Sequence, residues 1–155
     1  IATGSSAKSV EHCKRAGADF VVDHPSDKTV AEIFEFTSGG KVDRVVDGDF
    51  GVNLPSVLDV LKTNGVIATY SSMTDMNPAI PFIRMMFMDM TVRMVLVYAM
   101  PGEAKQQAME DITAILTNEQ FDHRVAATFP LGQSTKAHEE IEKGDNYGSV
   151  IITVD

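Results

Sequence analysis

The sequence predicts an α/β protein built on a doubly wound, mostly parallel sheet. Short apolar segments alternate with stretches whose apolar residues recur every three or four positions, which is the pattern of strands alternating with helices. The strand segments are apolar on both faces, as strands covered by helices on both sides must be. Helices that connect parallel strands make right-handed crossovers, and the doubly wound arrangement follows.

The first two strand–helix units lie at the beginning of the chain. Residues 1–3 favour a strand, and either Ser5 or Ser6 can cap the helix that follows. The apolar positions of that helix recur at three-residue spacing, and we expect Gly17 to end it. The second unit has a strand within the segment DFVVDH and a helix that ends at residues 38–40, where the sequence is Ser-Gly-Gly.

The third unit repeats this pattern, and the later segments are less regular. It has a strand VDRVVD at residues 42–47 and a helix after Pro55. The later elements that we expect are a strand at 66–70, a short helix near 82–87, a long strand at 91–100, a helix from 101 to 118, a strand at 124–129, a helix capped by Ser134 and a last strand at 148–154. The apolar positions that we expect these last two helices to bury are Ala108, Ile112, Ile115, Leu116, Ala137 and Ile141.

Composition excludes several classes of protein. A chain of 155 residues with 44% hydrophobic content is sufficient for a single buried core. The formal net charge of -9 argues against nucleic acid and anionic membranes as partners, because an acidic surface repels both. The single cysteine, Cys13, excludes an intrachain disulfide and fits a reducing cytoplasm, where we expect the protein to be. The sequence contains no apolar stretch of the ~20 residues that a membrane-spanning helix needs.

Four segments resemble the zinc-independent quinone oxidoreductases of the medium-chain dehydrogenase/reductase superfamily. They are IATGSSAKSVEHCKRAGADFVVDH, VDRVVDG, NGVIATYSS and FPLGQSTKAHEEIEKGDNYGSVIITV, of which the last is the most specific. The resemblance implies that residues 1–120 form an incomplete NAD(P)-binding Rossmann domain and that residues 121–155 form a segment that returns to the catalytic domain. The sheet then lacks its first strand and glycine-rich turn, and the chain is the later part of a longer protein.

The residues after the first expected strand bear on the choice of coenzyme. Proteins that prefer NAD place Asp or Glu at this position, where the carboxylate binds the ribose 2′-hydroxyl and repels a 2′-phosphate. Here the sequence has Ser5, Ser6 and Lys8, whose hydroxyls and ammonium suit a phosphate. The alternative is that a serine only caps the helix and that Lys8 is solvated. The resemblance favours NADPH as the cofactor, with these three residues at its 2′-phosphate.

The resemblance also implies contacts at the ends of the later strands. They are His24 at the adenosine end, Asp47 and Gly48 on the floor of the ligand crevice, and Tyr70 and Ser71 beside the nicotinamide. Two alternatives remain open, because His24 also suits a surface loop and the hydroxyls of Tyr70 and Ser71 also suit bonds to local backbone. The segment GDFG at residues 48–51 departs from the family pattern, and by itself it is typical of a plain loop.

The function implied by the resemblance is hydride transfer from NADPH to a quinone or another conjugated carbonyl. The coenzyme carries that chemistry, so we name no catalytic residue in this part of the protein and expect the chain alone to be inactive. Two rivals are a zinc-dependent alcohol dehydrogenase or enoyl reductase of the same superfamily, and a non-catalytic dimerisation or binding module. The four histidines lack the spacing of metal ligands, and no metal site is indicated.

The segment rich in methionine has two interpretations. Eight of the nine methionines fall within residues 73–100. Their flexible side chains suit a pocket for flat apolar substrates, but core filling and subunit contact are the favoured interpretation. The strand expected from Thr91 to Met100 corresponds to the strand through which members of this superfamily dimerise, so the resemblance implies a homodimer.

Overall fold

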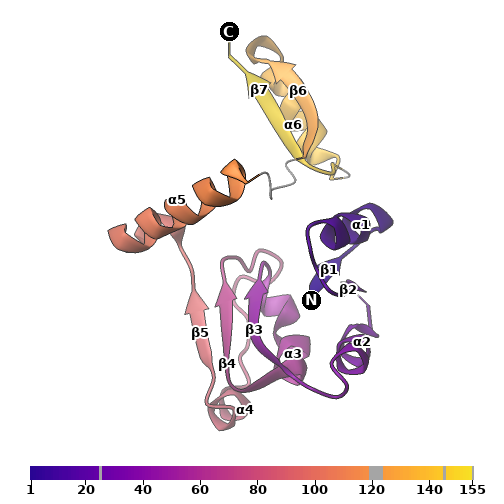
Figure 1. Ribbon diagram of the computed structural model, residues 1–155, viewed down its shortest axis with the longest axis vertical. Helices are drawn as coiled ribbons and strands as arrows, with labels where there is room; N and C mark the ends of the chain where they lie inside the picture. Colours follow the sequence, from indigo (N-terminus) through magenta and orange to yellow (C-terminus); the bar gives the residue numbers. More distant parts are fainter. Residues whose placement is uncertain (25, 119–123, 145, 155) are drawn as a thin grey trace.

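The structure is a computed structural model that describes residues 1–24, 26–118, 124–144 and 146–154. Strands and helices alternate along most of the chain, as predicted for an α/β protein (Figure 1). The elements are β1 (Ala2–Gly4), α1 (Ala7–Arg15), β2 (Val21–Asp23), α2 (Thr29–Phe36), β3 (Val42–Asp47), α3 (Phe50–Val60), β4 (Leu61–Thr69), α4 (Phe82–Phe87), β5 (Thr91–Met94), η1 (Val97–Ala99), α5 (Gly102–Thr117), β6 (Val125–Pro130), η2 (Leu131–Gln133), α6 (Ser134–Glu142) and β7 (Ser149–Thr153).

All the strand pairs are parallel, and they form three separate sheets. The sheets are β1–β2, β3–β4–β5 and β6–β7 (Figure 1). Among the described residues β1 pairs only with β2, and β3 pairs only with β4 and not with β1. Val46, in the middle of β3, is 79% exposed, so one face of this strand has no covering helix within the described part of the chain. The parallel α/β class is therefore confirmed, with the sheet interrupted between β1 and β3.

The main core lies between α3 and the sheet β3–β4–β5. Its buried members are Phe50, Leu54, Val57, Leu58, Leu61 and Ile67, all from α3 and β4. Met85, Met88 and Met90 pack against this core, whereas Met73, Met76, Met86 and Met94 are exposed. Methionine therefore fills the core at some positions and faces outward at others. A second cluster, made by Val22, Ile33 and Val60, joins the β1–β2 sheet to α3.

The helix expected after Pro55 begins earlier than predicted. It starts at Phe50 and contains Pro55, although an interior proline removes a backbone N–H and disfavours helix. Phe50 and Leu54 are one turn apart and are 4% and 2% exposed, so burial of this face holds the first turn in place. The interpretation of GDFG as a plain loop was accordingly wrong, because its last two residues are helical.

The long strand expected at residues 91–100 is also shorter than predicted. β5 ends at Met94, which lies opposite Thr69, the last residue of β4. Val95 N donates the last hydrogen bond to Thr69 O at 2.7 Å, and beyond this point the described part of the chain gives residues 96–100 no partner strand. The chain leaves the sheet there and forms the short helix η1, because a strand without a neighbour loses its backbone hydrogen bonds.

Two expected helical faces are less buried than their patterns predict. α5 contains no buried residue, and Ile112, Ile115 and Leu116 are 52%, 37% and 43% exposed. Figure 1 shows that α5 stands away from the sheets, so the described residues provide no surface to cover this face. In α6, Ala137 is buried as expected, but Ile141 is 56% exposed. Ser134 is the first residue of α6 and does not cap it, since Gln133 holds the cap position without a side-chain bond.

The strands β6 and β7 and the helix α6 form a small unit of their own (Figure 1). Tyr147 connects this unit to α1, because its ring meets the His12 ring edge-on at a centroid distance of 5.7 Å. The Arg124 guanidinium lies over the same tyrosine ring, 4.3 Å from its centroid. The predicted domain boundary at residues 120–121 lies outside the described residues and stays a prediction.

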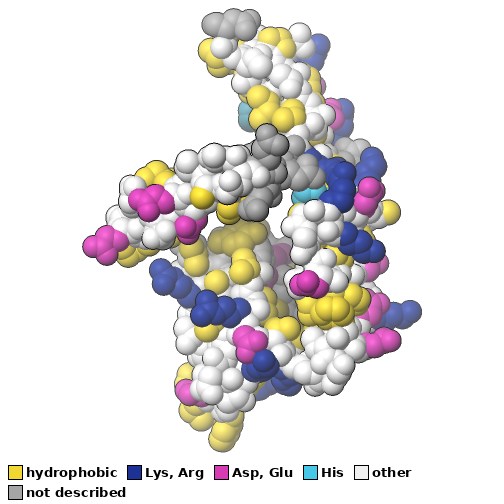
Figure 2. Space-filling model, in the orientation of Figure 1, with side chains coloured by type: hydrophobic (Ala, Val, Ile, Leu, Met, Phe, Trp, Pro, Cys, Tyr) yellow, Lys and Arg dark blue, Asp and Glu magenta, His cyan; other side chains and the backbone are white. Residues whose placement is uncertain are grey.

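The surface beside the carboxyl ends of β4 and β5 is apolar. Figure 2 shows yellow side chains exposed below α5 in this region. The large apolar side chains exposed in the segments that follow these strands are Tyr70, Met73, Met76, Leu96, Val97 and Tyr98. None of the described helices is both long and apolar enough to cross a membrane.

Candidate functional site

The predicted site residues fall into two groups at the carboxyl ends of parallel strands. Ser5, Ser6, Lys8 and His24 follow β1 and β2, and Asp47, Gly48, Tyr70 and Ser71 end or follow β3 and β4. Each group is brought together by the pairing of its two strands, since parallel strands end on the same edge. β1 and β3 are not paired, so no strand ladder joins the two groups among the described residues.

The first group is built on the turn between β1 and α1. Ser6 is the helix cap, and its Oγ accepts a hydrogen bond from Ser9 N at 3.2 Å, while Ser6 N donates to Ser9 Oγ at 2.9 Å. The capping alternative therefore holds for Ser6. Ser5 and Lys8 are exposed on the same turn, and the first turn of α1 contains no acidic residue. A hydroxyl and an ammonium thus lie at the positive end of a helix, where an anion is favoured.

His24 lies beside this turn. Its backbone N donates to Gly4 O at 2.9 Å, which continues the pairing of β1 with β2 by one residue. Its side chain is partly buried. Gly4 itself is buried, and an added Cβ would come 3.0 Å from Val10 Cγ2, so a larger residue would crowd the place where β1 meets α1. Because Gly4 pairs with Asp23, the next residues of the two strands, Ser5 and His24, lie beside each other.

The second group centres on Asp47, which is 4% exposed. Its Oδ1 accepts hydrogen bonds from Asp49 N at 2.9 Å and from Asn53 Nδ2 at 2.7 Å. Its Oδ2 is buried, and no donor within the described part of the chain reaches it. Asp47 thus fixes the turn from β3 into α3. Sequence reasoning missed Asn53, although an amide in the first turn of a helix that follows an acidic strand end is a usable signal.

Tyr70 lies across Gly48. A Cβ added to Gly48 would come 2.9 Å from Tyr70 Oη, and Tyr70 N donates to Asp47 O at 3.3 Å. The tyrosine is 67% exposed, so its ring forms an outer surface at the end of β4. Ser71 contributes its backbone, because Ser71 O accepts from Phe50 N at 3.0 Å and from Thr69 Oγ1 at 3.1 Å.

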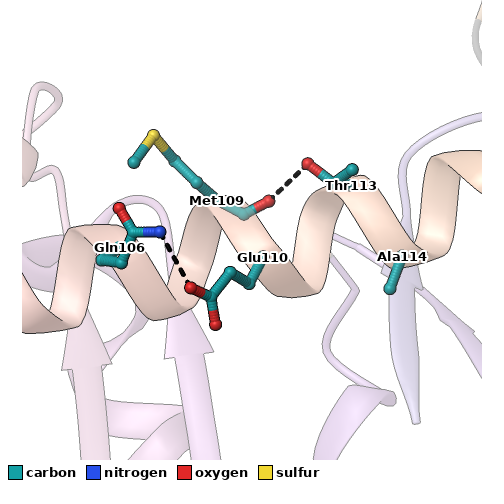
Figure 3. Close-up of a pocket in the computed structure, with 5 residues that line it drawn as sticks. All are labelled: Gln106, Met109, Glu110, Thr113 and Ala114. Carbon is teal, nitrogen blue, oxygen red and sulfur yellow. Dashed lines mark hydrogen bonds between the residues drawn. The ribbon is translucent and has the colours of Figure 1, made fainter.

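Two other features do not form sites. Among residues 1–24, 26–118, 124–144 and 146–154, no group of three or more His, Cys, Asp or Glu side chains is placed to hold a metal ion. A hollow on α5 is lined by Gln106, Met109, Glu110, Thr113 and Ala114, all from one helix (Figure 3). Gln106 Nε2 donates to Glu110 Oε1 at 2.8 Å and Thr113 Oγ1 donates to Met109 O at 2.7 Å, so these polar groups serve the helix itself.

Parallel strands connected by helices, with polar residues at the strand ends, define the arrangement of nucleotide-binding domains. The family model described as zinc-binding dehydrogenase matches residues 16–152. The chain therefore belongs to the zinc-binding dehydrogenase family, and its resemblance to the quinone oxidoreductases of the medium-chain superfamily is confirmed.

Solved structures agree with this family. A mycobacterial quinone oxidoreductase is 25% identical, with a TM-score of 0.82 over 96% of this chain and 46% of that chain. A mycobacterial protein complexed with NADPH is 24% identical, with a TM-score of 0.81 over 98% of this chain and 49% of that chain. An NAD-dependent alcohol dehydrogenase is 20% identical, with a TM-score of 0.82 over 99% and 43%. The last two likenesses support the fold alone, and the chain spans less than half the length of all three proteins.

Proposed function

We propose that the protein is an NADPH-dependent oxidoreductase that reduces a quinone or another conjugated carbonyl. The observation that carries the proposal is the turn after β1, which presents Ser5 and Lys8 and has no acid in the first turn of α1. The family, the likeness to a quinone oxidoreductase and the likeness to a protein complexed with NADPH support it. The activity is that of the whole protein, because the chain covers less than half of these relatives.

The residues present fit the adenosine half of a phosphorylated dinucleotide. Ser5 and Lys8 bind the 2′-phosphate, and the N-terminus of α1 adds its positive dipole. Ser6 acts through the cap, because its hydroxyl is bonded to Ser9 and keeps the first turn of α1 in place. His24 lies next to the same turn, where it would contact the adenine ribose of the bound coenzyme.

The residues after β3 and β4 fit the nicotinamide half. The bound coenzyme supplies the hydride. Asp47 and Gly48 form the crevice floor, and the absence of a side chain at Gly48 allows the hydroxyl of Tyr70 to lie against this floor. Tyr70 and Ser71 lie at the end of β4 and face the nicotinamide ribose. The exposed apolar side chains of residues 70–98 exclude water from the acceptor once the rest of the protein covers them.

We extend the proposal to assembly and location. β5 pairs only with β4 among the described residues, so its other edge is open to the same strand of a second copy. The homodimer then forms through Thr91–Met94 rather than through the longer strand that the sequence predicts. We also propose a cytoplasmic protein with a small-molecule acceptor and without nucleic acid or membrane partners, in keeping with the acidic net charge of -9.

The experiment is a comparison of substrates on the intact protein, together with metal analysis. We expect NADPH oxidation with a quinone or an enone, and we expect activity to survive removal of metal ions. Alcohol oxidation that depends on bound zinc would instead identify the rival alcohol dehydrogenase, a class to which one similar structure belongs. A protein that binds NADPH but reduces neither acceptor would contradict the proposed reaction.

A further inference from the structure

The last three residues of the GDFG segment at residues 48–51, Asp49, Phe50 and Gly51, have no function in the scheme above. In the structure GDFG comprises the turn after β3 and the first two residues of α3, and it lies against residues 70–75, the segment that follows β4. Asp49, Phe50 and Gly51 each have a hydrogen-bond partner in that segment, and Gly48 lies close to Tyr70. We call these two segments together the loop clamp.

Three hydrogen bonds hold the loop clamp. Phe50 N donates to Ser71 O at 3.0 Å, Gly51 N donates to Ser72 Oγ at 2.9 Å, and Thr74 N donates to Asp49 Oδ1 at 3.2 Å. Ser72 Oγ also donates to Asp75 O, so this hydroxyl is both acceptor and donor within the clamp. Two side chains, Asp49 and Ser72, therefore make the side-chain bonds of the clamp, and the other groups are backbone.

The two glycines make this close approach sterically feasible. A Cβ added to Gly51 would lie 2.8 Å from both Cβ and O of Asp75 and 3.0 Å from Ser72 Oγ. A Cβ added to Gly48 would lie 2.9 Å from Tyr70 Oη. All these distances are shorter than normal van der Waals contact. Gly51 therefore allows Asp75 to approach the turn closely, and Gly48 allows Tyr70 to do so.

The loop clamp also provides the hydrogen-bond acceptors for the first N–H groups of α3. The first N–H groups of a helix have no partner within the helix and are the usual donors to a bound anion. In α3 the N–H groups of Phe50 and Gly51 are already donated to Ser71 O and Ser72 Oγ. The carboxylate of Asp49 stands at the same helix end and repels anions. This end of the helix therefore holds the neighbouring loop in place, and its first two N–H groups are engaged by that loop and not by a phosphate.

We propose that Asp49 and Ser72 are positioning residues, which hold Tyr70 and Ser71 in place beside the nicotinamide half of the coenzyme. They act through the loop clamp and do not touch the coenzyme themselves. The proposal rests on the proposed function and deepens it, because it assigns the residues that fix this half of the site. The adenosine half, at the turn after β1, is independent of the clamp.

The experiment measures dissociation constants of the intact protein for NADPH and for adenosine 2′,5′-bisphosphate, which lacks the nicotinamide half. The variants are Ser72→Ala, Asp49→Ala and Asp49→Asn. Ser56→Ala is the matched control, because Ser56 Oγ donates to Asn53 O within α3 and lies outside the clamp. Amide hydrogen exchange of Gly51 and Thr74 reports whether each clamp bond has been lost.

Loss of one clamp bond is expected to weaken NADPH binding about tenfold and to leave the affinity for the bisphosphate unchanged. Gly51 N–H should exchange about tenfold faster in Ser72→Ala, and Thr74 N–H should do so in Asp49→Ala. Asp49→Asn keeps an oxygen acceptor for Thr74 N and should restore binding. Ser56→Ala should change neither ligand's affinity.

Four outcomes would overturn the proposal. Faster exchange with unchanged NADPH affinity would show that the clamp does not position the coenzyme. Equal loss of affinity for NADPH and for the bisphosphate would show a general structural defect. A wild-type protein that binds the bisphosphate but not NADPH would remove the nicotinamide half of the site. A wild-type protein that binds neither ligand would refute the proposed function itself, and this proposal would fail with it.

Discussion

The same substitution at two helix starts should have opposite effects on stability. Gly51 and Gly102 both lie at the beginning of a helix, the first in α3 and the second in α5. A Cβ at Gly51 would meet Asp75 at 2.8 Å, whereas a Cβ at Gly102 would have nothing within 4 Å. Packing therefore distinguishes two positions that look equivalent in helix propensity.

The expected magnitudes follow from these contacts. Overpacking costs about 1–3 kcal/mol, and alanine regains up to about 1 kcal/mol over glycine in a helix. Gly51→Ala should therefore destabilise the protein by about 1–2 kcal/mol. Gly102→Ala should stabilise it by about 0.4–1 kcal/mol, because it only reduces the freedom of the unfolded chain.

The assay is thermal unfolding of each variant beside the wild type. At about 2–4 °C per kcal/mol for a chain of this size, the two variants should differ in Tm by about 3–12 °C, with Gly51→Ala the lower. Equal Tm values for the two variants would refute the steric argument. They would also show that residues 70–75 do not lie against Gly51 as described.

Two further predictions concern a buried acid and the dimer. Asp47→Ala leaves Asp49 N and Asn53 Nδ2 without their acceptor, and it should lower the free energy of unfolding in urea by about 1–3 kcal/mol. The control Asp43→Ala breaks only an exposed ion pair with Lys62 and should cost less than about 1 kcal/mol. Equal losses in the two variants would contradict the assigned role of Asp47. Val95 N donates to Thr69 O of β4, and successive N–H groups of a strand point to opposite sides, so Met94 N points to the open edge of β5. Met94→Pro removes this donor and should convert the dimer to a monomer in sedimentation analysis. A dimer that persists in this variant would contradict pairing through β5.

The parts of the fold that follow from local pattern could be predicted from the sequence. The strand at residues 42–47 and the short helix at 82–87 match their predicted bounds, because each is bounded by turn or polar residues and its apolar positions have one period. The cap by Ser6 follows equally from local hydrogen bonding. The candidate residues lie at the carboxyl ends of parallel strands, because each of them ends or follows a strand segment that its local pattern predicts.

The features that depend on distant contacts could not be predicted in this way. β5 ends where β4 ends, and nothing in residues 91–100 specifies the length of a neighbouring strand. The apolar pattern of α5 identifies its apolar face but not what covers it. The hydrogen bond from Thr74 N to Asp49 Oδ1 joins residues far apart in sequence. A local pattern does not contain such contacts, and the sequence therefore predicted only a loop for GDFG.

The central claim is that the turn after β1 selects a 2′-phosphorylated coenzyme. The most direct measurement is the pair of dissociation constants for NADPH and NADH, determined for the intact wild-type protein and for Lys8→Ala. We predict that the wild type binds NADPH more tightly, and that Lys8→Ala weakens NADPH binding about tenfold while NADH binding is unchanged. A wild type that prefers NADH, or a Lys8→Ala variant with the preference of the wild type, would contradict the claim.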